Sequence, residues 1–331
     1  MKRFLALCFA LAALLSCGNR REALLPNVSG KAGEVIVVMP RSDWEGDLGN
    51  SARALLAQDT PWLPIREPLY TLVNINPGDL SQMFKVHRNI VYFDIDPQVA
   101  ESGVKYLKDR WASPQCLVYV SAPTSEEALA LFDGEGGKIL SYIEQAERDR
   151  VISNAKHYEE RPLGAKVAEV FGGSPHFPIG YSLKKITSDF AWIADEKQYT
   201  NQGILIYRYP AGENPFTLDN IVARRNAILQ VNVPGMFENT YMTTGKYPAP
   251  TIEYIKYRGR EFAQVRGWWE VENDYMAGPF VSHSFYSPDG KSVIVAEAFL
   301  YAPKYDKRQY LRQVESLLYS WEQNDDDKEQ K

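Results

Sequence analysis

Short runs of β-branched residues predict four strands in the first half of the chain. Such runs, closed by proline, asparagine or aspartate, are typical of buried strands. They occupy Glu34–Met39, Leu69–Ile75, Asn89–Asp94 and Gln115–Ser121. Apolar residues at helical spacing lie between them, so we expect strands and helices to alternate in this half.

Three helices are expected between and after these strands. One follows Ser42, a second starts at Pro77, where proline suits the first helical position, and a third starts at Thr124–Glu127, which matches a capping box. Gly134–Gly137 interrupts the third pattern, which resumes over Lys138–His157. Because glycine is a poor helix former, we predict a break in the helix at these glycines.

The second half of the chain is richer in strand patterns. Strands are expected at Tyr181–Ile186, Phe190–Ala194, Gly203–Tyr209, Thr251–Tyr257, Glu261–Glu272, Gly278–Tyr286 and Lys291–Ala302, with helices at Leu218–Gln230 and Asp306–Trp321. Two stretches with Gly and Pro, Arg161–Gly164 and Gly172–Pro178, predict a boundary in the middle. The predicted fold class is therefore α+β, with two lobes of mixed or antiparallel sheet packed with helices. The lobes are expected at residues 34–165 and 177–322, followed by an acidic tail, 323–331, that is too polar to fold.

The amino terminus has the pattern of an exported protein. Lys2 and Arg3 precede an apolar run, Phe4–Leu15, which would span about 18 Å as a helix and so falls short of a ~30 Å membrane core. This pattern indicates a signal peptide, residues 1–16. The sequence Leu14–Cys17 resembles the bacterial lipobox, in which the cysteine is diacylated and becomes the new amino terminus.

Lipidation of Cys17 predicts an anchor in a membrane, because two or more acyl chains bind stably where one does not. Residues 17–33 are mostly polar or small, as expected of a tether. Bacterial sorting rules send a lipoprotein with Gly18 after the cysteine to the outer membrane, and the lack of an acidic cluster favours its periplasmic face. The alternative is an ordinary signal peptide cut near Ser16, with an incidental cysteine.

Composition and cysteine content exclude two functional classes. The 331 residues carry a net charge of −5 and no basic stripe, so nucleic acid is not expected as a partner. With Cys8 in the signal peptide and Cys17 lipidated, Cys116 alone is left for the folded body. It lies in the apolar run Cys116–Val120, which indicates a buried structural thiol rather than a nucleophile.

Several runs resemble landmarks of an uncharacterised lipoprotein family, that of domain of unknown function 4837. They are Ala112–Gln115, Val231–Gly235, Gly278–His283 and Leu311–Tyr319. The resemblance extends from Glu34 to Tyr319 and implies a lipid-anchored protein of the cell envelope. It implies no reaction, because the family has no assigned activity.

The sequence contains no common catalytic or cofactor-binding motif. It lacks the Gly-x-Ser-x-Gly elbow, the Gly-rich phosphate loop, Cys-x-x-Cys and His-Glu-x-x-His. Its four histidines are far apart, so we predict no metal set of short spacing and no cofactor. Asp94 and Asp96 offer paired carboxylates to a divalent cation, although two acidic residues before Pro97 are more typical of a turn.

The strand pattern of Phe262–Val271 gives the candidate site. Alternation places apolar residues on one face and puts Arg266 and Trp268 on the other. Glu297 and His283 are polar residues on otherwise apolar strands. If these strands adjoin, Arg266, Trp268, His283 and Glu297 converge into a site for an acidic sugar or a peptide carboxylate, with arginine binding the anion and tryptophan stacking. The alternative is an internal Arg–Glu pair, with Trp268 partly packed under a loop.

Three functions therefore remain open. We favour a non-catalytic envelope protein that binds a glycan, peptide or protein partner, because 20 Tyr and 7 Trp suit a recognition surface. The second is an envelope hydrolase or transferase with a site that no short motif reveals. The third is a structural lipoprotein that assembles with other envelope components.

Overall fold

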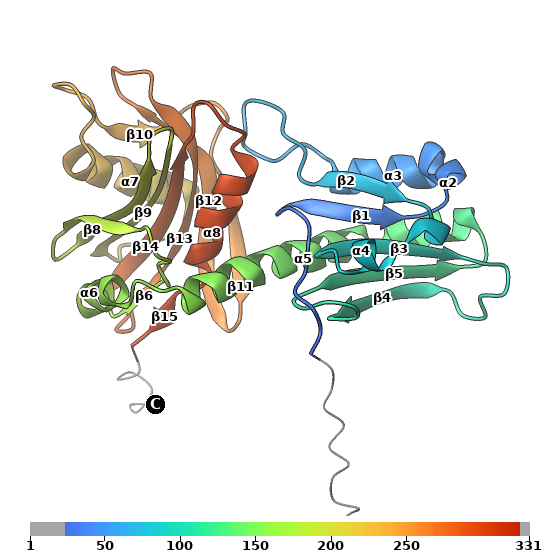
Figure 1. The fold of residues 1–331 in the computed structure, drawn as a ribbon. Coiled ribbons are helices and arrows are strands. Elements are labelled where there is room, and N and C mark those ends of the chain that lie inside the picture. The colour runs from blue at the N-terminus through green and yellow to red at the C-terminus, as the bar shows by residue number, and fades with distance from the viewer. Residues whose placement is uncertain (1–23, 325–331) are drawn as a thin grey trace, which may run out of the picture.

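Two sheets lie side by side and are connected by one long helix, α5 (Ser125–His157) (Figure 1). The computed structural model describes residues 24–324. The first sheet has the strand order β2-β1-β3-β5-β4, and the second runs β10-β12-β13-β14-β9-β8-β7 with β11 also paired to β12. The predicted α+β class with two lobes of mixed or antiparallel sheet is confirmed.

The first lobe is built on a mostly parallel sheet. Its strands are β1 (Glu34–Val38), β2 (Thr71–Ile75), β3 (Asn89–Ile95), β4 (Gly103–Lys108) and β5 (Cys116–Ala122). All pairs are parallel except β4 with β5. The four predicted strands are present, but β4 was not predicted, because this exposed edge strand carries Lys105 and Lys108 and lacks a continuous apolar run.

Helices cover the two faces of this sheet unequally. One face packs against α3 (Asp47–Leu56) and α5 and forms a large buried core. The other face is only partly covered, by the one-turn segments η1 (Pro77–Asp79) and α4 (Gln82–Lys85). The helix predicted from Pro77 to Phe84 is therefore two short turns. A further short helix, α2 (Arg41–Glu45), precedes α3.

Helix α5 is continuous over 33 residues, so the predicted break at Gly134–Gly137 is wrong. Its start is as predicted, because the Thr124 side chain accepts a hydrogen bond from the Glu127 amide. Gly136 is buried against Leu55 of α3, so the helices approach closely where a side chain is missing. Packing along the whole helix outweighs the low helix propensity of these glycines.

Replacing Gly137 with alanine should raise the free energy of unfolding by about 0.5–1 kcal/mol. A Cβ at this exposed helical position meets nothing within 4 Å, so only the gain in helix propensity remains. Gly49→Ala is the matched contrast in α3, because its Cβ would lie 2.0 Å from the Trp44 carbonyl oxygen and should destabilise the protein. Urea denaturation of both variants measures the difference; a loss of stability in Gly137→Ala would contradict the uninterrupted helix.

The second lobe is built on a curved antiparallel sheet. Its strands are β7 (Ser182–Ile186), β8 (Phe190–Lys197), β9 (Thr200–Pro210), β10 (Met242–Thr244), β11 (Thr251–Tyr257), β12 (Arg260–Val271), β13 (Ala277–Tyr286) and β14 (Ser292–Tyr301). Helix α7 (Leu218–Asn232) packs on one face, and helices α6 (Arg161–Phe171) and α8 (Arg308–Leu318) pack on the other. A small pair, β6 (Gly173–Ser174) with β15 (Glu322–Gln323), lies beside them.

The stretch Arg161–Gly164, predicted as part of a boundary, is the start of helix α6. Pro162 sits in its first turn, and Gly172 ends it with a left-handed φ of 74°. Proline in the first turn and glycine just after the last turn are common at helix ends. These two residues therefore mark the start and the end of helix α6. Val167 and Phe171 on its inner face are buried in the core of the second lobe.

Residues of α5 belong to both cores. Phe132 and Ile143 are buried against the first sheet, whereas Ile152 and Ala155 are buried in the second lobe with α6 and α8. A loop of the first lobe completes the junction, because the Glu67 carboxylate accepts hydrogen bonds of 2.8 and 2.7 Å from the first amides of α8. A negative charge at a helix N-terminus is stabilising, so this contact ties α8 to the other lobe.

The chain enters the first lobe at the end of its sheet where β3 and β5 begin. Ser113 donates its amide to the Pro26 carbonyl at 2.9 Å, and Ser29 donates its amide to the Val86 carbonyl at 2.8 Å. The predicted tether therefore becomes part of the folded body from Pro26 onward. The predicted signal peptide, Cys17 and the tail beyond residue 324 lie outside the described residues. Between residues 24 and 324, no helix is long and apolar enough to cross a membrane.

Candidate functional site

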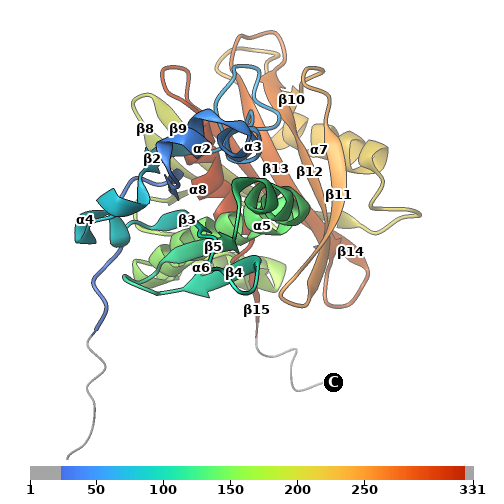
Figure 2. The ribbon, with the colours of Figure 1, turned by 90° about the vertical axis from the view of Figure 1, so that its right-hand side faces the viewer.

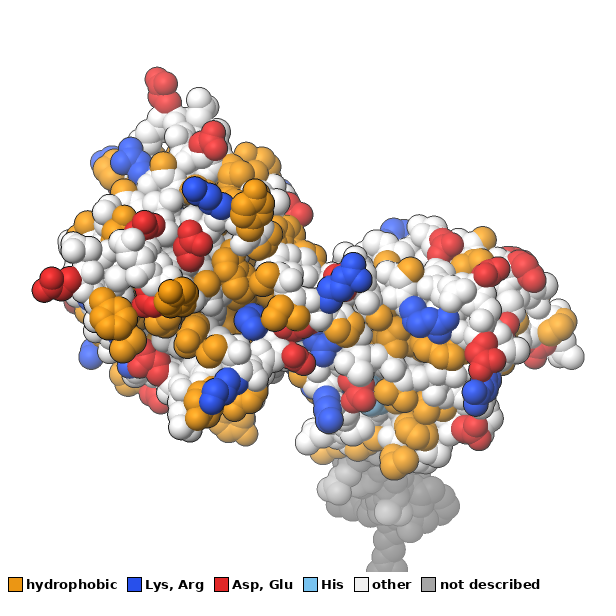
Figure 3. Space-filling view, turned by 90° about the horizontal axis from the view of Figure 1, so that it is seen from above, with side chains coloured by type: hydrophobic (Ala, Val, Ile, Leu, Met, Phe, Trp, Pro, Cys, Tyr) orange, Lys and Arg blue, Asp and Glu red, His pale blue; other side chains and the backbone are white. Residues whose placement is uncertain are grey.

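A cleft of about 440 Å³ lies at the junction of the two lobes. Helices α5 and α8, strands β11 and β12 and the loop of residues 57–70 line it. Viewed from above, basic and acidic side chains gather side by side where the lobes meet (Figure 3). Its charged residues are Glu144, Arg148, Glu253, Arg266, Arg308, Arg312 and Glu315.

Arg266 of β12 lines this cleft and is held by a bidentate ion pair with Glu315 of α8. One guanidinium nitrogen lies 2.9 Å from the Glu315 carboxylate, and the other contacts its second oxygen. Burial opposes ionisation of Glu315, but the Arg266 guanidinium outweighs it and lowers the pKa of the carboxyl group. The guanidinium carbon also lies 5.4 Å from the ring centroid of Trp62, which comes from the first lobe.

Arg148 of α5 lines the same cleft and is held by an aromatic ring instead of a carboxylate. Its guanidinium stacks on the ring of Tyr319 at 3.8 Å, and it donates one hydrogen bond of 3.2 Å to Gln145. Among the residues that the structure describes, no carboxylate oxygen lies within 4 Å of its nitrogens. Tyr319 in turn donates a hydrogen bond of 2.8 Å to Gln264, and burial raises the pKa of this tyrosine to about 12.

A second ion pair closes the cleft on the side of the first lobe. Arg312 of α8 donates to Glu144 of α5 at 3.0 Å, and the Tyr70 hydroxyl donates to the same carboxylate at 2.5 Å. Two of the arginines in the cleft thus have carboxylate partners, whereas Arg148 is kept in position by an aromatic ring. An arginine whose guanidinium stacks on an aromatic ring keeps the N–H groups at the edge of the guanidinium available to a ligand.

His283 lies behind the cleft. It faces Gln264 across β12 and β13, at 3.3 Å from the amide oxygen, and its ring stacks on Phe262 at 4.0 Å. Tyr319 covers it at 4.6 Å between ring centroids. The histidine is fully buried, so it supports the wall that carries Gln264 and Tyr319 and does not reach the cleft.

Glu297 faces the opposite side of the sheet. Strand register pairs it with Ser282 and Leu205, and its side chain points toward α7. There the Arg225 guanidinium binds both carboxylate oxygens, at 2.9 and 2.7 Å. Neither side chain is exposed to solvent.

The structure does not bring the four predicted site residues together. Trp268 shares a strand face with Arg266, but it is packed against the segment at Gly245 and does not line the cleft. Arg266 alone of the four contributes to it. The alternative, an internal Arg–Glu pair, describes Glu297 correctly except for its partner, which is Arg225 and not Arg266. Arg148 was missed, because it lies in a charged helical stretch where nothing in the sequence sets it apart.

Two other candidates from the sequence have structural roles. Cys116 is buried beneath α5, and burial raises the pKa of its thiol to about 12, so the thiolate nucleophile is scarce at neutral pH. Asp94 accepts a hydrogen bond of 2.7 Å from the Tyr119 hydroxyl, and Asp96 accepts one of 2.8 Å from the Gln98 amide, as in a turn. From residue 24 to residue 324, no three His, Cys, Asp or Glu residues lie close enough to hold a metal ion.

Stability should fall in mild acid because of His283. Burial, with the nearby Arg260, Arg266 and Arg148 charges, lowers its pKa well below 6.5. In the unfolded chain the pKa of this histidine is about 6.5, so the unfolded chain binds a proton at a higher pH than the folded protein does. The free energy of unfolding therefore decreases as the pH falls below 6.5, by up to about 1.4 kcal/mol per pH unit. We expect His283→Phe to reduce this slope in urea denaturation between pH 7 and pH 5. An unchanged slope would contradict a buried neutral histidine.

Comparison with known proteins gives two domains of unknown function. The family model described as domain of unknown function (DUF4837) matches residues 161–320, and that described as domain of unknown function (DUF8532) matches residues 28–156. The resemblance expected over Glu34–Tyr319 is therefore divided between two families. The chain thus carries a DUF4837 domain in its second half. Cys17, on which the lipoprotein prediction depends, lies outside both matches.

Two solved structures are distantly similar to part of this chain. A point mutant of the protein Mog1 has 7% sequence identity and a TM-score of 0.28, covering 46% of this chain and 90% of that chain. Human STARD10 has 9% identity and a TM-score of 0.24, covering 48% of this chain and 80% of that chain. No curated protein matches the sequence.

Proposed function

We propose that this protein is a lipid-anchored envelope protein that binds an acidic glycan or peptide in the cleft between its lobes, without catalysing a reaction. Arg148 carries the proposal, because it is an arginine in a cleft that has an aromatic support and no carboxylate partner within 4 Å among the described residues. A carboxylate of the ligand would complete its coordination by two parallel hydrogen bonds.

The surroundings of Arg148 suit a ligand of this class. Trp62 provides a ring face on which a sugar or a peptide side chain packs. Arg266 and Arg312 are held by carboxylates, and Arg308 donates to the Pro68 carbonyl and the Thr71 hydroxyl, so these three arginines shape the cleft wall. Arg148 is then the arginine that we expect to select for negative charge.

Lipidation at Cys17 supports the envelope location. The chain enters the folded body at Pro26, so a short segment separates the body from the proposed anchor. Cys17→Ala should abolish metabolic labelling with an alkyne fatty acid. Normal labelling of that variant would show that Cys17 is not the acylated residue.

Binding is tested with soluble acidic muropeptides and with glucuronic acid, measured by calorimetry. We expect Arg148→Met to weaken binding by about 10- to 100-fold, because one charge-assisted hydrogen-bond pair is worth roughly 1.5–3 kcal/mol. The control is Arg224→Met, which removes an exposed arginine of α7 away from the cleft. Equal loss in both variants, or no binding of any acidic ligand by the wild type, would contradict the cleft as the site. Turnover of a bound ligand would instead support the enzyme alternative.

A further inference from the structure

The first lobe leaves one face of its parallel sheet largely uncovered. On the face under α3 and α5, the strands contribute a continuous core of fully buried residues. On the other face, the only buried core residues are Ile36, Val38, Ile90 and Leu117 among those that the structure describes. Parallel sheets normally have both faces covered, so this face is expected to have a partner.

A groove of about 700 Å³ runs over this open face. Aromatic residues form its floor, with the rings of Tyr92 and Tyr119 stacked at 5.0 Å and Trp111 beside them. Exposed Leu107 of β4 adds apolar surface at the rim.

The charge of this groove is strongly positive. Three cations line it on the open face, namely Lys85, Lys105 and Arg110, whereas Lys108 pairs with Cys116 and extends toward the α5 face of the sheet. Within residues 24–324, none of them has a carboxylate oxygen within 4 Å, although ion pairs are common elsewhere in the chain. Asp109, the acidic residue among the groove residues, uses its carboxylate to accept the Gln115 amide at 2.8 Å. Unneutralised cations beside aromatic residues favour an anionic partner.

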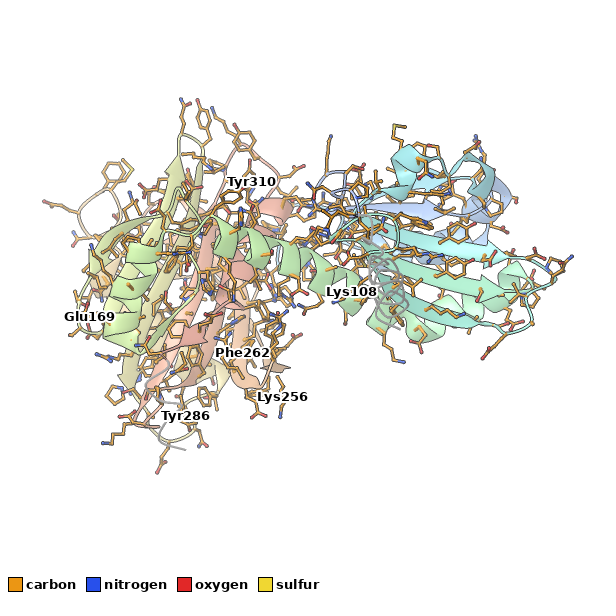
Figure 4. The ribbon with its side chains drawn as sticks, turned by 60° about the horizontal axis from the view of Figure 1, so that its bottom comes forward. Lys108, Glu169, Lys256, Phe262, Tyr286 and Tyr310 are labelled. Carbon is orange, nitrogen blue, oxygen red and sulfur yellow. The ribbon has the colours of Figure 1, made fainter. Side chains whose placement is uncertain are left out.

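The same surface lies where the chain arrives from the proposed lipid anchor. Ser29 is hydrogen-bonded to Val86, next to Lys85, and Pro26 to Ser113, next to the loop of Trp111. Figure 2 shows the blue start of the chain leaving the lobe beneath α4, and Figure 4 labels Lys108 on the same lobe seen from below. An extended chain from Cys17 to Pro26 reaches at most about 30 Å, so this part of the lobe is held close to the bilayer.

Exposed apolar side chains occupy this part of the lobe as well. Leu24 is 98% exposed and Met83 of α4 is 69% exposed, beside the entering chain and the groove. Tryptophan, leucine and methionine beside lysine and arginine are the residues that insert into the interface of a bilayer.

We propose that the open face of the first lobe docks on a bilayer that contains anionic phospholipid. In this arrangement Lys85, Lys105 and Arg110 contact phosphate groups, and Trp111 and Leu107 enter the headgroup region. This inference rests on the lipid anchor of the proposed function.

The test uses the chain from Gly18 without lipid, which contains every described element. Sedimentation with vesicles of phosphatidylcholine containing phosphatidylglycerol is compared with pure phosphatidylcholine. We expect binding to the anionic vesicles alone, decreasing with salt. Lys105→Gln with Arg110→Gln should weaken it by roughly 10- to 30-fold, because each basic residue near an anionic surface contributes about fivefold. Both side chains are exposed, so the fold is unaffected.

The matched control is Lys166→Gln with Lys246→Gln, which removes the same charge from exposed positions of the second lobe. Equal weakening by the control pair, or binding that does not depend on anionic lipid, would overturn the proposal. Self-association in sedimentation velocity that the Lys105 and Arg110 substitutions abolish would assign the face to a second copy instead. Because this chain lacks the anchor and retains the cleft, failure here leaves the lipidation and muropeptide experiments to decide the proposed function separately.

Discussion

Replacing Arg225 with methionine should lower the free energy of unfolding by about 3–5 kcal/mol. Arg225 of α7 crosses the core of the second lobe to Glu297 of β14, and both are inaccessible to solvent. It also donates to the Thr244 hydroxyl at 2.9 Å, and its guanidinium lies 3.9 Å from the centre of the Phe280 ring. Methionine fills similar volume but leaves the Glu297 carboxylate in an apolar core with only the Tyr207 hydroxyl, at 3.2 Å. An uncompensated buried charge is the costliest single defect in a core.

The double variant Arg225→Met with Glu297→Leu should recover most of this loss, because it removes the stranded charge as well. Arg224→Met is the control, since the neighbouring arginine is exposed and its loss should change stability by no more than ~0.5 kcal/mol. Chemical denaturation of the wild type, Arg225→Met, Glu297→Leu and the double variant gives the coupling free energy between the two residues. A loss in Arg225→Met that the second substitution fails to rescue would contradict the isolated carboxylate as its cause.

Sequence patterns predicted the elements whose burial is uniform along their length. Strands β1, β3 and β5 are continuous apolar runs that are buried along most of their length. Strand β4 was missed because it is an exposed edge with a polar face. The break predicted in α5 was wrong because the prediction considered only the low helix propensity of glycine. It did not include the packing of this helix against the cores of both lobes, which stabilises it.

For the candidate site, the sequence could predict only which face of a single strand each residue occupies. Alternation along β12 placed Arg266 on the correct face of the strand. Glu297, a carboxylate on an otherwise apolar strand, was correctly identified as a residue that needs a partner. Which side of the sheet each strand presents to which helix depends on register and on helix packing over long sequence separations. Arg225 lies 72 positions from Glu297, so no local pattern connects them. The cleft itself forms between lobes and has no signature within either one.

Replacing Arg150 with methionine should destabilise the first lobe by about 3–5 kcal/mol, because four acceptors lose a buried donor at about 1 kcal/mol or more each, although Glu147 keeps an ion pair with Arg88 at 3.1 Å. This buried arginine of α5 donates to the Pro114 carbonyl at 3.0 Å and to the Arg88 carbonyl at 2.8 Å, just before strands β5 and β3. It also donates to Asn89 at 2.9 Å and to the buried Glu147 carboxylate at 2.9 Å. Burial lowers the pKa of Arg150, which shows that its charge is taken from water at a cost that these four acceptors must offset.

Arg148→Met provides the contrast within the same helix, two positions away. Arg148 makes one hydrogen bond to a neutral side chain and no ion pair within 4 Å among residues 24–324, so its loss should change stability by less than ~1 kcal/mol. The same substitution should abolish most of the binding to acidic muropeptides, whereas Arg150→Met should affect binding only in proportion to the fraction unfolded. Thermal melts and calorimetry on both variants separate the two roles. A large loss of stability in Arg148→Met would show that this arginine belongs to the framework of the lobe junction, and the proposal that it binds the ligand would then be wrong.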